Sequence, residues 1–296
     1  MARYIFLDNW VFSFLNNPSA EARLTAFVRS NGFTVLLTSL SLVELYNPGW
    51  QGAVREERGA AAVRFLARVP CVVVNPQRVW EMEVAAHLGQ LRNLPIELDL
   101  SILPDDLREA TLLGFLRRDD LFLQQGLDIQ AWSLSYKEVK EGWLADVANI
   151  IETACSRGHL KRDKAGKFME LADFREIFLL SLDLRHADGR DVNAILTDVL
   201  ERPQAGLYSH LTSVRLSSLC FWYSYIDIDK SNQPKRQGSD IGDFYHLSLL
   251  PYCSAFTTDG TMYRTLQRIR ERERVIPINC QLMTKDLLEE SIRQYA

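Results

Sequence analysis

The sequence predicts an α/β fold in which helices cover a parallel sheet and an all-helical segment is inserted between two α/β parts. Over residues 4–76, short apolar runs alternate with segments of helical character, which is the chain order of a parallel sheet. From about residue 95 to residue 226 no convincing strand follows, and the alternation returns from residue 239 onward. The chain has 296 residues and is 47% hydrophobic, which is enough to bury a core in each part.

The first elements are bounded by residues that typically begin or end helices. Residues 4–7 form an apolar run that predicts a buried strand, and Asp8 lies at its carboxyl end. A helix that begins at Pro18 is predicted to stop at Gly32. Residues 33–37 then form a second apolar run, which predicts the next strand.

A third strand follows two further predicted helices. Ser41 and Glu44 have the spacing of a capping box, so a helix is expected to begin there. An Ala- and Arg-rich helix is expected over residues 52–68, and a strand over residues 71–74. Asn75 has the character of an N-cap for the helix after that strand.

The second half of the chain begins with apolar residues spaced three and four apart, which is typical of helices. Residues 227–239 are polar and contain Pro and Gly, so they predict a loop or linker. The elements expected after this linker are a helix over 239–250, a strand over 255–258, a helix over 261–274, a strand over 275–280 and a helix over 284–295.

Five carboxylates fall at the carboxyl ends of predicted strands or at the helix starts just beyond them: Asp8, Glu44, Asp240, Asp243 and Asp259. Functional groups of open parallel sheets gather at this edge. Clustered carboxylates repel one another and need cations, and hard oxygen ligands suit Mg²⁺ or Mn²⁺. Each residue also has a purely structural interpretation as a turn residue, a helix cap or a partner of the helix dipole.

Four segments, three of which carry these carboxylates, resemble the PIN-domain family: residues 4–15, 36–47, 66–76 and, above all, 239–262. In that family four acidic positions surround the metal, and the resemblance places these roles on Asp8, Glu44, Asp240 or Asp243, and Asp259. The Thr-Thr-Asp sequence that ends at Asp259 matches the family's habit of a strand closing in Thr-x-Asp. Asn9 stands where the family often has Ser or Thr.

The resemblance implies a Rossmann-type, three-layer PIN-like domain made of residues 1–93 and 236–296, with residues 94–235 as a helical insertion. It implies a metal-dependent hydrolase that cleaves phosphodiester bonds of nucleic acid. RNA is favoured over single-stranded DNA, and endonucleolytic over exonucleolytic cleavage. Asp8, Asp243 and Asp259 are the expected main ligands of Mg²⁺ or Mn²⁺, and Glu44 and Asp240 the expected further ligands or water-orienting bases.

Substrate must be held by local positive charge, because the net charge of −4 excludes a general polyanion binder. The candidate substrate-binding residues are Asn9, Lys235, Arg236, Arg264 and Arg268. Beyond Arg268, a solvated helix face is at least as good an interpretation of the arginines. His246 is expected to pack and hydrogen-bond near the acidic residues rather than to touch phosphate.

Two other interpretations compete with the nuclease. The PIN-like domain would be catalytically silent and bind protein or nucleic acid through the helical insertion if a salt bridge filled its acidic pocket. A phosphatase of the haloacid-dehalogenase type needs a second Asp two residues after the first, and Trp10 stands there. The expected partner is nucleic acid, while a protein inhibitor or partner on the insertion and a homodimer both stay open.

The cysteine pattern and the hydropathy predict a cytoplasmic protein without a membrane partner. The five cysteines are scattered and form no C-x-x-C pair, so neither a zinc site nor a redox motif is indicated. Buried thiols of this kind are typical of a reducing compartment. No apolar run approaches the roughly 18 residues of a membrane span.

Overall fold

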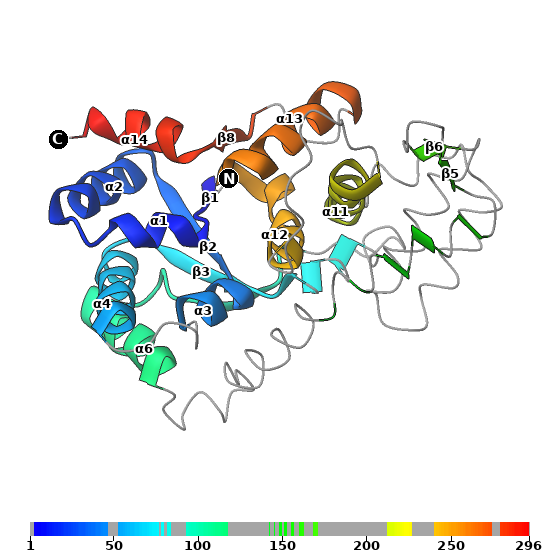
Figure 1. Ribbon diagram of the computed structural model, residues 1–296. Coiled ribbons are helices and arrows are strands. Elements are labelled where there is room, and N and C mark those ends of the chain that lie inside the picture. Colours follow the sequence, from blue (N-terminus) through cyan, green and yellow to red (C-terminus); the bar gives the residue numbers. More distant parts are fainter. Residues whose placement is uncertain are drawn as a thin grey trace.

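A computed structural model describes most of the α/β part of the chain. Described are residues 3–46, 53–76, 93–117, 212–226, 240–273 and 279–295, with short pieces at 78–79, 82–83, 142, 145, 148–149, 151–152, 155–156, 160–162 and 168–170. The fold is α/β, as the sequence predicts, and its main feature is a six-stranded sheet in the order β4-β3-β2-β1-β7-β8 (Figure 1).

All neighbouring strands of this sheet are parallel except β3 and β4. The strands are β1 (Arg3–Phe6), β2 (Phe33–Thr38), β3 (Cys71–Val74), β4 (Ile96–Asp99), β7 (Cys253–Thr257) and β8 (Gln281–Met283). β1 lies in the middle, where Ile5 is in register with Val35 of β2 and with Ala255 of β7. Residues from the two ends of the chain therefore form adjacent strands.

Helices cover both faces of the sheet. They are α1 (Asn9–Phe14), α2 (Pro18–Ser30), α3 (Ser39–Tyr46), α4 (Ala53–Ala67), α6 (Asp105–Arg117), α11 (Thr212–Phe221), α12 (Asp240–Leu247), α13 (Gly260–Glu273) and α14 (Lys285–Arg293). Because successive strand residues point to opposite faces, Ile5 packs in the core formed with α1, α2, α4 and α14, whereas Phe6 packs in the core formed with α11, α12 and α13. Figure 1 shows these two groups on opposite sides of the sheet.

Several predicted elements are confirmed closely. The strand predicted over residues 71–74 is β3, and the helix predicted to begin at Pro18 is α2. Asn17 caps α2 by accepting from Ser19 N at 2.9 Å, and Gly32 after the helix has a φ of 62°, a conformation that Gly adopts without strain.

One expectation about strands was wrong. Strands do occur between residues 95 and 226, namely β4, β5 (Leu160–Arg162) and β6 (Phe168–Glu170). β4 pairs with β3, so this piece of the expected insertion belongs to the main sheet, and α6 packs against α4 in the same way. The strand expected over residues 275–280 is β8 at Gln281–Met283, while residues 274–278 lie outside the described part.

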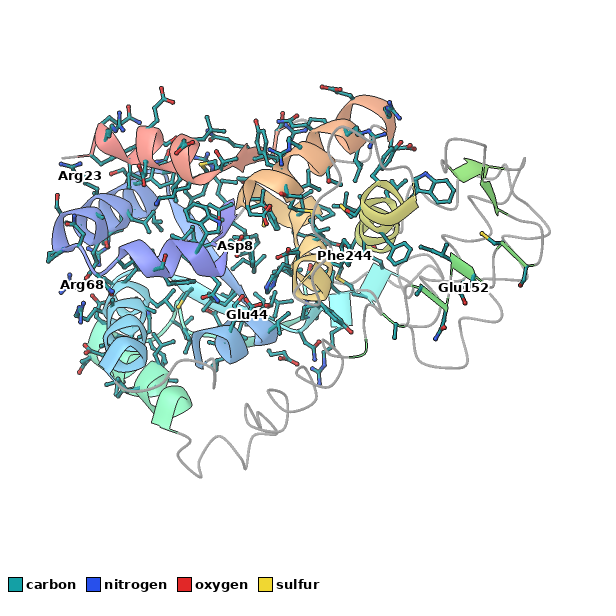
Figure 2. All side chains as sticks on the ribbon, viewed as in Figure 1. Asp8, Arg23, Glu44, Arg68, Glu152 and Phe244 are labelled. Atoms are coloured by element: carbon teal, nitrogen blue, oxygen red, sulfur yellow. The ribbon has the colours of Figure 1, made fainter. Side chains whose placement is uncertain are left out.

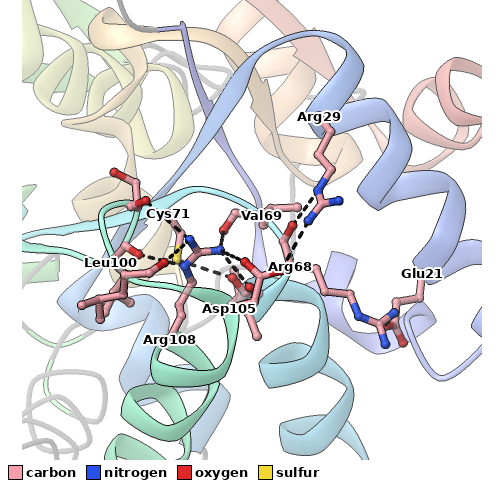
Figure 3. A network of polar contacts seen from close by, with 12 residues as sticks. Glu21, Arg29, Arg68, Val69, Cys71, Leu100, Asp105 and Arg108 are labelled. Atoms are coloured by element: carbon pink, nitrogen blue, oxygen red, sulfur yellow. Dashed lines mark hydrogen bonds and ion pairs between the residues drawn. The ribbon is translucent and has the colours of Figure 1, made fainter.

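Arg108, on α6, fastens β4 and α6 to the end of α4 (Figure 3). Its side chain is only 5% exposed. Its guanidinium donates to the carbonyl oxygens of Leu100 at 2.8 Å, Ala67 at 2.8 Å, Val69 at 3.0 Å and Leu103 at 2.7 Å. One side chain thus satisfies buried acceptors from two segments more than thirty residues apart.

Glu83 makes a comparable link on the other face of the sheet. Its buried carboxylate accepts hydrogen bonds from Ser213 N at 3.0 and 2.9 Å and from the Tyr252 hydroxyl at 2.9 Å. Ser213 lies in the first turn of α11, where the helix leaves backbone N–H groups without an internal partner. The carboxylate therefore fixes the start of α11 against the segment that leads into β7.

No helix in the described ranges is long and apolar enough to cross a bilayer.

We expect Arg108→Met to lower the free energy of unfolding by about 3 kcal/mol, because it leaves several buried carbonyl oxygens without a donor. Urea unfolding followed by circular dichroism measures this difference. Arg293→Met is the matched control, since Arg293 is exposed on α14 and its loss should cost no more than about 0.5 kcal/mol. Equal effects of the two substitutions would contradict the structural role of Arg108.

Candidate active site

Asp8 is held at the carboxyl end of β1 by its own helix and by β7. Its backbone N–H donates to Thr257 Oγ1 at 2.6 Å, and the Thr257 hydroxyl donates to Phe6 O at 3.2 Å. Asp8 is also the N-cap of α1, where its Oδ1 accepts from Asn9 N at 2.6 Å. The Thr257 hydroxyl thus fixes the backbone at Asp8 against the end of β1.

Asp259 occupies the equivalent place after β7. Its Oδ1 accepts from Met262 N at 2.7 Å, so it caps the first turn of α13, and the residue is exposed. The neighbouring backbone is anchored to β8, because Thr258 N donates to Met283 O at 2.9 Å. Asp8 and Asp259 therefore each use one carboxylate oxygen at a helix start, and Oδ2 of each makes no hydrogen bond within the described residues.

Glu44 reaches the same edge from α3. The expected capping box of Ser41 and Glu44 was wrong: α3 begins at Ser39, and the reciprocal cap joins Thr38 and Ser41. Ser41 N donates to Thr38 Oγ1 at 2.8 Å, and Thr38 N donates to Ser41 Oγ at 3.2 Å. Glu44 therefore takes no part in this cap, and its Oε2 lies 3.3 Å from Nε2 of His246 on α12. Figure 2 labels Asp8, which precedes α1, and Glu44 on α3.

Electrostatics tie these residues into one cluster. Burial, which is the largest cause, raises the pKa of Asp8, and so do the negative charges of Glu44 and Asp259, while His246 and the hydrogen bond from Asn9 N lower it. Together these effects raise the pKa of Asp8 from 3.8 to about 7. The charges of Glu44 on α3 and of Asp259 after β7 therefore both act on Asp8 after β1.

The donor chemistry fits a hard divalent cation. Besides the carboxylates, Asn9 Oδ1 is a buried acceptor for which the described residues provide no hydrogen-bond partner. An acid whose pKa is raised to about 7 by burial and by like charge is a group that a bound cation would return to its ionised form. Still, no three His, Cys, Asp or Glu side chains in the described ranges lie close enough together to hold one ion.

Asp243 lies on α12, the helix that also carries His246. It is half-buried on α12, and its charge raises the pKa of the Cys220 thiol on α11 after burial has already raised it. The charges that shift the pKa of Asp8 come instead from α3, α12 and the start of α13 through Glu44, His246 and Asp259. The side chain of Asp240 lies outside the described part of the chain.

Two of the expected substrate-binding residues lie on α13. Arg264 is exposed in the first turns of α13, where it makes a 3.4 Å hydrogen bond to Thr261 Oγ1. Arg268 lies over the ring of Tyr223 at 4.9 Å, so it is engaged in packing against the segment after α11. Lys235 and Arg236 lie outside the described residues.

One contributor, Thr38, was not foreseen from the sequence as part of the site. Thr38 at the end of β2 joins the α3 cap to His246, since its Oγ1 lies 3.0 Å from His246 Nδ1. His246 was expected to pack and hydrogen-bond nearby, and it does so at 3% exposure. The sequence gives only a weak indication of this pair. Thr38 has a hydroxyl directly after the strand predicted over residues 33–37, and His246 has an imidazole on the helix predicted over residues 239–250.

A hollow of about 300 Å³ lies at the opposite end of the sheet, beside the start of β2 and the residue before β3. Three arginines line it, but they already have partners. Arg108 is bonded to carbonyls, Arg68 Nη1 lies 3.0 Å from the buried Glu21 carboxylate, and Arg29 Nε donates to Arg68 O at 2.8 Å. This hollow is therefore not part of the acidic cluster.

Searches of protein-family models, of curated proteins and of solved structures return no match to this chain.

We expect the stability of the metal-free protein to fall as the pH rises from about 4 to about 7. The folded chain holds the Asp8 proton up to about pH 7, while the unfolded chain releases it near 3.8, so the folded state binds more protons between these values. Below pH 3.8 the protonated Asp8 contributes its full stability to the fold, and this stability is lost as the pH rises through about 7. Asp8→Asn keeps a good N-cap residue and removes the titrating carboxyl. It should therefore abolish this pH-dependent fall in the free energy of unfolding, which is on the order of 2–4 kcal/mol.

Urea unfolding in EDTA at about pH 5 and about pH 8 measures this effect. Asp8→Asn should gain stability relative to the wild-type chain at the higher pH. Asp106→Asn, on the exposed start of α6, should follow the wild-type profile. A wild-type profile for Asp8→Asn as well would show that Asp8 is ionised throughout.

Proposed function

We propose that the chain is a metal-dependent nuclease of the PIN-like type, with single-stranded RNA as its preferred substrate and internal cleavage as its mode. The observation that supports this most strongly is the electrostatic cluster of Asp8, Glu44 and Asp259. The sequence resemblance places acidic metal ligands at these three positions, and they meet at one edge of the sheet.

The location of the cluster supports a catalytic use. In order of appearance, the five parallel strands run third, second, first, fourth and fifth across the sheet, which is the Rossmann-type order. The order reverses at β1, which has β2 on one side and β7 on the other. Ligands of open α/β sheets bind beyond the carboxyl ends of the strands at such a reversal, and Asp8 directly follows β1 there.

The residues have distinct roles in the proposed reaction. Asp8 and Asp259, which each use one carboxylate oxygen in capping, would hold Mg²⁺ or Mn²⁺. Glu44 would be a further ligand or would orient water. Asp240 and Asp243 on α12 are proposed further ligands. A bound ion of this kind supplies an activated water and offsets charge on the phosphate. Arg264 and the first turn of α13 attract the phosphate groups next to Asp259.

The competing proposal is a catalytically silent PIN-like domain that binds protein or nucleic acid through residues 94–235. A lysine or arginine that filled the acidic cluster would favour it. Within the described residues, neither Asp8 nor Asp259 forms a salt bridge, and the only basic partner of Glu44 is His246. The nuclease proposal is preferred on this ground.

We expect the wild-type protein to cleave labelled single-stranded RNA in Mg²⁺ or Mn²⁺ and to stop in EDTA. Asp8→Asn and Asp259→Asn should each lower the rate at least about 100-fold, because each removes a charge that holds the metal. Asp106→Asn, exposed on α6, is the matched control and should cleave at the wild-type rate.

Single-stranded DNA of the same sequence tests the preference for RNA, and circularised RNA tests for internal cleavage. If Asp8→Asn is folded and cleaves as fast as the wild-type chain, the cluster is structural. Absence of cleavage with retained RNA binding would favour the silent binding module.

Arg264→Ala should raise KM for RNA several-fold and leave kcat within about twofold, because a single phosphate contact contributes to binding in the ground and transition states alike. The slope of log affinity against log salt should fall by about 1. Filter binding to RNA in EDTA at several salt concentrations measures the slope. Arg293→Ala, exposed on α14, is the control, and an equal change in both variants would remove Arg264 from the binding surface.

A further inference from the structure

His246 is fixed on three sides at the carboxyl edge of the sheet. Its side chain is 4% exposed. The ring centroid lies 4.9 Å from that of Phe6, the last residue of β1. Its Nδ1 lies 3.0 Å from Thr38 Oγ1 and its Nε2 lies 3.3 Å from Glu44 Oε2. The two ring nitrogens therefore connect the end of β2 with a carboxylate on α3.

We infer that His246 is a positioning residue that holds the Glu44 carboxylate at the metal-binding edge and is itself oriented by the Thr38 hydroxyl. This inference rests on the proposed function, because it assigns to His246 a role in metal binding by Glu44. It does not place His246 in contact with metal or substrate.

Hydrogen-bond chemistry determines which atom donates. An ionised carboxylate only accepts, so the contact with Glu44 requires a proton on His246 Nε2. The Thr38 hydroxyl can both donate and accept, and it meets His246 Nδ1 in either role. Nε2 therefore always faces Glu44 with its N–H, provided that Thr38 keeps the ring in this orientation.

Thr38 is well suited to this task because it is itself held in place. It is buried at the end of β2, and Ser41 N donates to its Oγ1 at 2.8 Å. Its hydroxyl also lies 2.9 Å from Ser41 Oγ. The cap that starts α3 thus fixes the Thr38 hydroxyl, and the hydroxyl in turn fixes the imidazole.

Glu44 needs such a partner more than the two aspartates do. Asp8 and Asp259 are short side chains held by backbone N–H groups at helix starts. Glu44 has a longer side chain that is 20% exposed, and His246 provides its hydrogen bond in the described part of the chain. Outer partners that orient a ligand typically contribute 10–100-fold in metal affinity, roughly.

The test compares His246→Gln with His246→Asn in the full chain. The Gln amide nitrogen can take the position of Nε2 and still donate to Glu44, whereas the shorter Asn amide reaches only toward Thr38. Mn²⁺ affinity is measured by electron paramagnetic resonance of the free ion, and kcat and KM are measured on single-stranded RNA. We expect roughly 10-fold weaker Mn²⁺ binding for His246→Asn and at most about threefold for His246→Gln.

A second pair of variants leaves the imidazole of His246 in place, so it tests the role of His246 even if the substitutions at position 246 prevent folding. Thr38→Val removes the hydroxyl with little change in shape, and Thr38→Ser keeps it. We expect Thr38→Val to weaken Mn²⁺ binding and lower kcat more than KM, with Thr38→Ser close to the wild-type chain. Thermal unfolding of all four variants identifies the folded fraction to which the affinities refer.

The outcomes distinguish a failure of the positioning role of His246 from a failure of the proposed nuclease function. If Asp8→Asn loses Mn²⁺ binding while folded His246→Asn and Thr38→Val bind it as the wild-type chain does, the positioning role is overturned and the nuclease proposal stands. If the wild-type chain neither binds Mn²⁺ nor cleaves nucleic acid, the proposed function fails and this inference fails with it.

Discussion

The position of β1 between β2 and β7 is the constraint on which the rest of the structure depends. Residues 3–6 pair in parallel with residues 33–36 on one side and with residues 253–256 on the other. Parallel pairing brings the carboxyl ends of all three strands to one edge of the sheet. Asp8, Glu44 and Asp259 follow these strands at that edge for this reason, although about 250 residues separate the first from the last.

Threonine hydroxyls at the strand ends fix the positions of the residues at this edge by hydrogen bonds. Thr257 accepts the Asp8 N–H and bonds back to β1, while Thr38 joins the α3 cap to His246. Both are buried, and both use a hydroxyl, a group that can donate and accept. A valine of the same shape would fill the space equally well and would leave the neighbouring polar groups without a partner.

The sequence was most informative where one residue type determines local geometry. Asn17, Pro18 and Gly32 bound α2 through capping, a fixed φ and a positive φ, which are properties of single residues. It was less informative for β4, because an edge strand that is exposed or half-buried throughout lacks the continuous apolar run of a central strand.

The candidate site followed the same rule. The strand-end positions of Asp8 and Asp259 could be predicted, because helix starts after strands favour acidic caps. The partner of Glu44 could not, because Ser41 lies three residues from Thr38 as well as from Glu44, and local spacing fits either cap. Only the packing of α12 against α3 distinguishes them, and that contact spans 202 residues.

The pairing of β1 with β7 also has a consequence for synthesis of the chain on the ribosome. Until residues 253–257 have left the exit tunnel, β1 has β2 as a neighbour and an open edge on its other side. An open edge of this kind can pair with other chains, so the nascent protein must protect it during the synthesis of about 250 residues. The same delay means that the three carboxylates meet only late in synthesis, and a chain released early would lack Asp259 and have an incomplete acidic cluster.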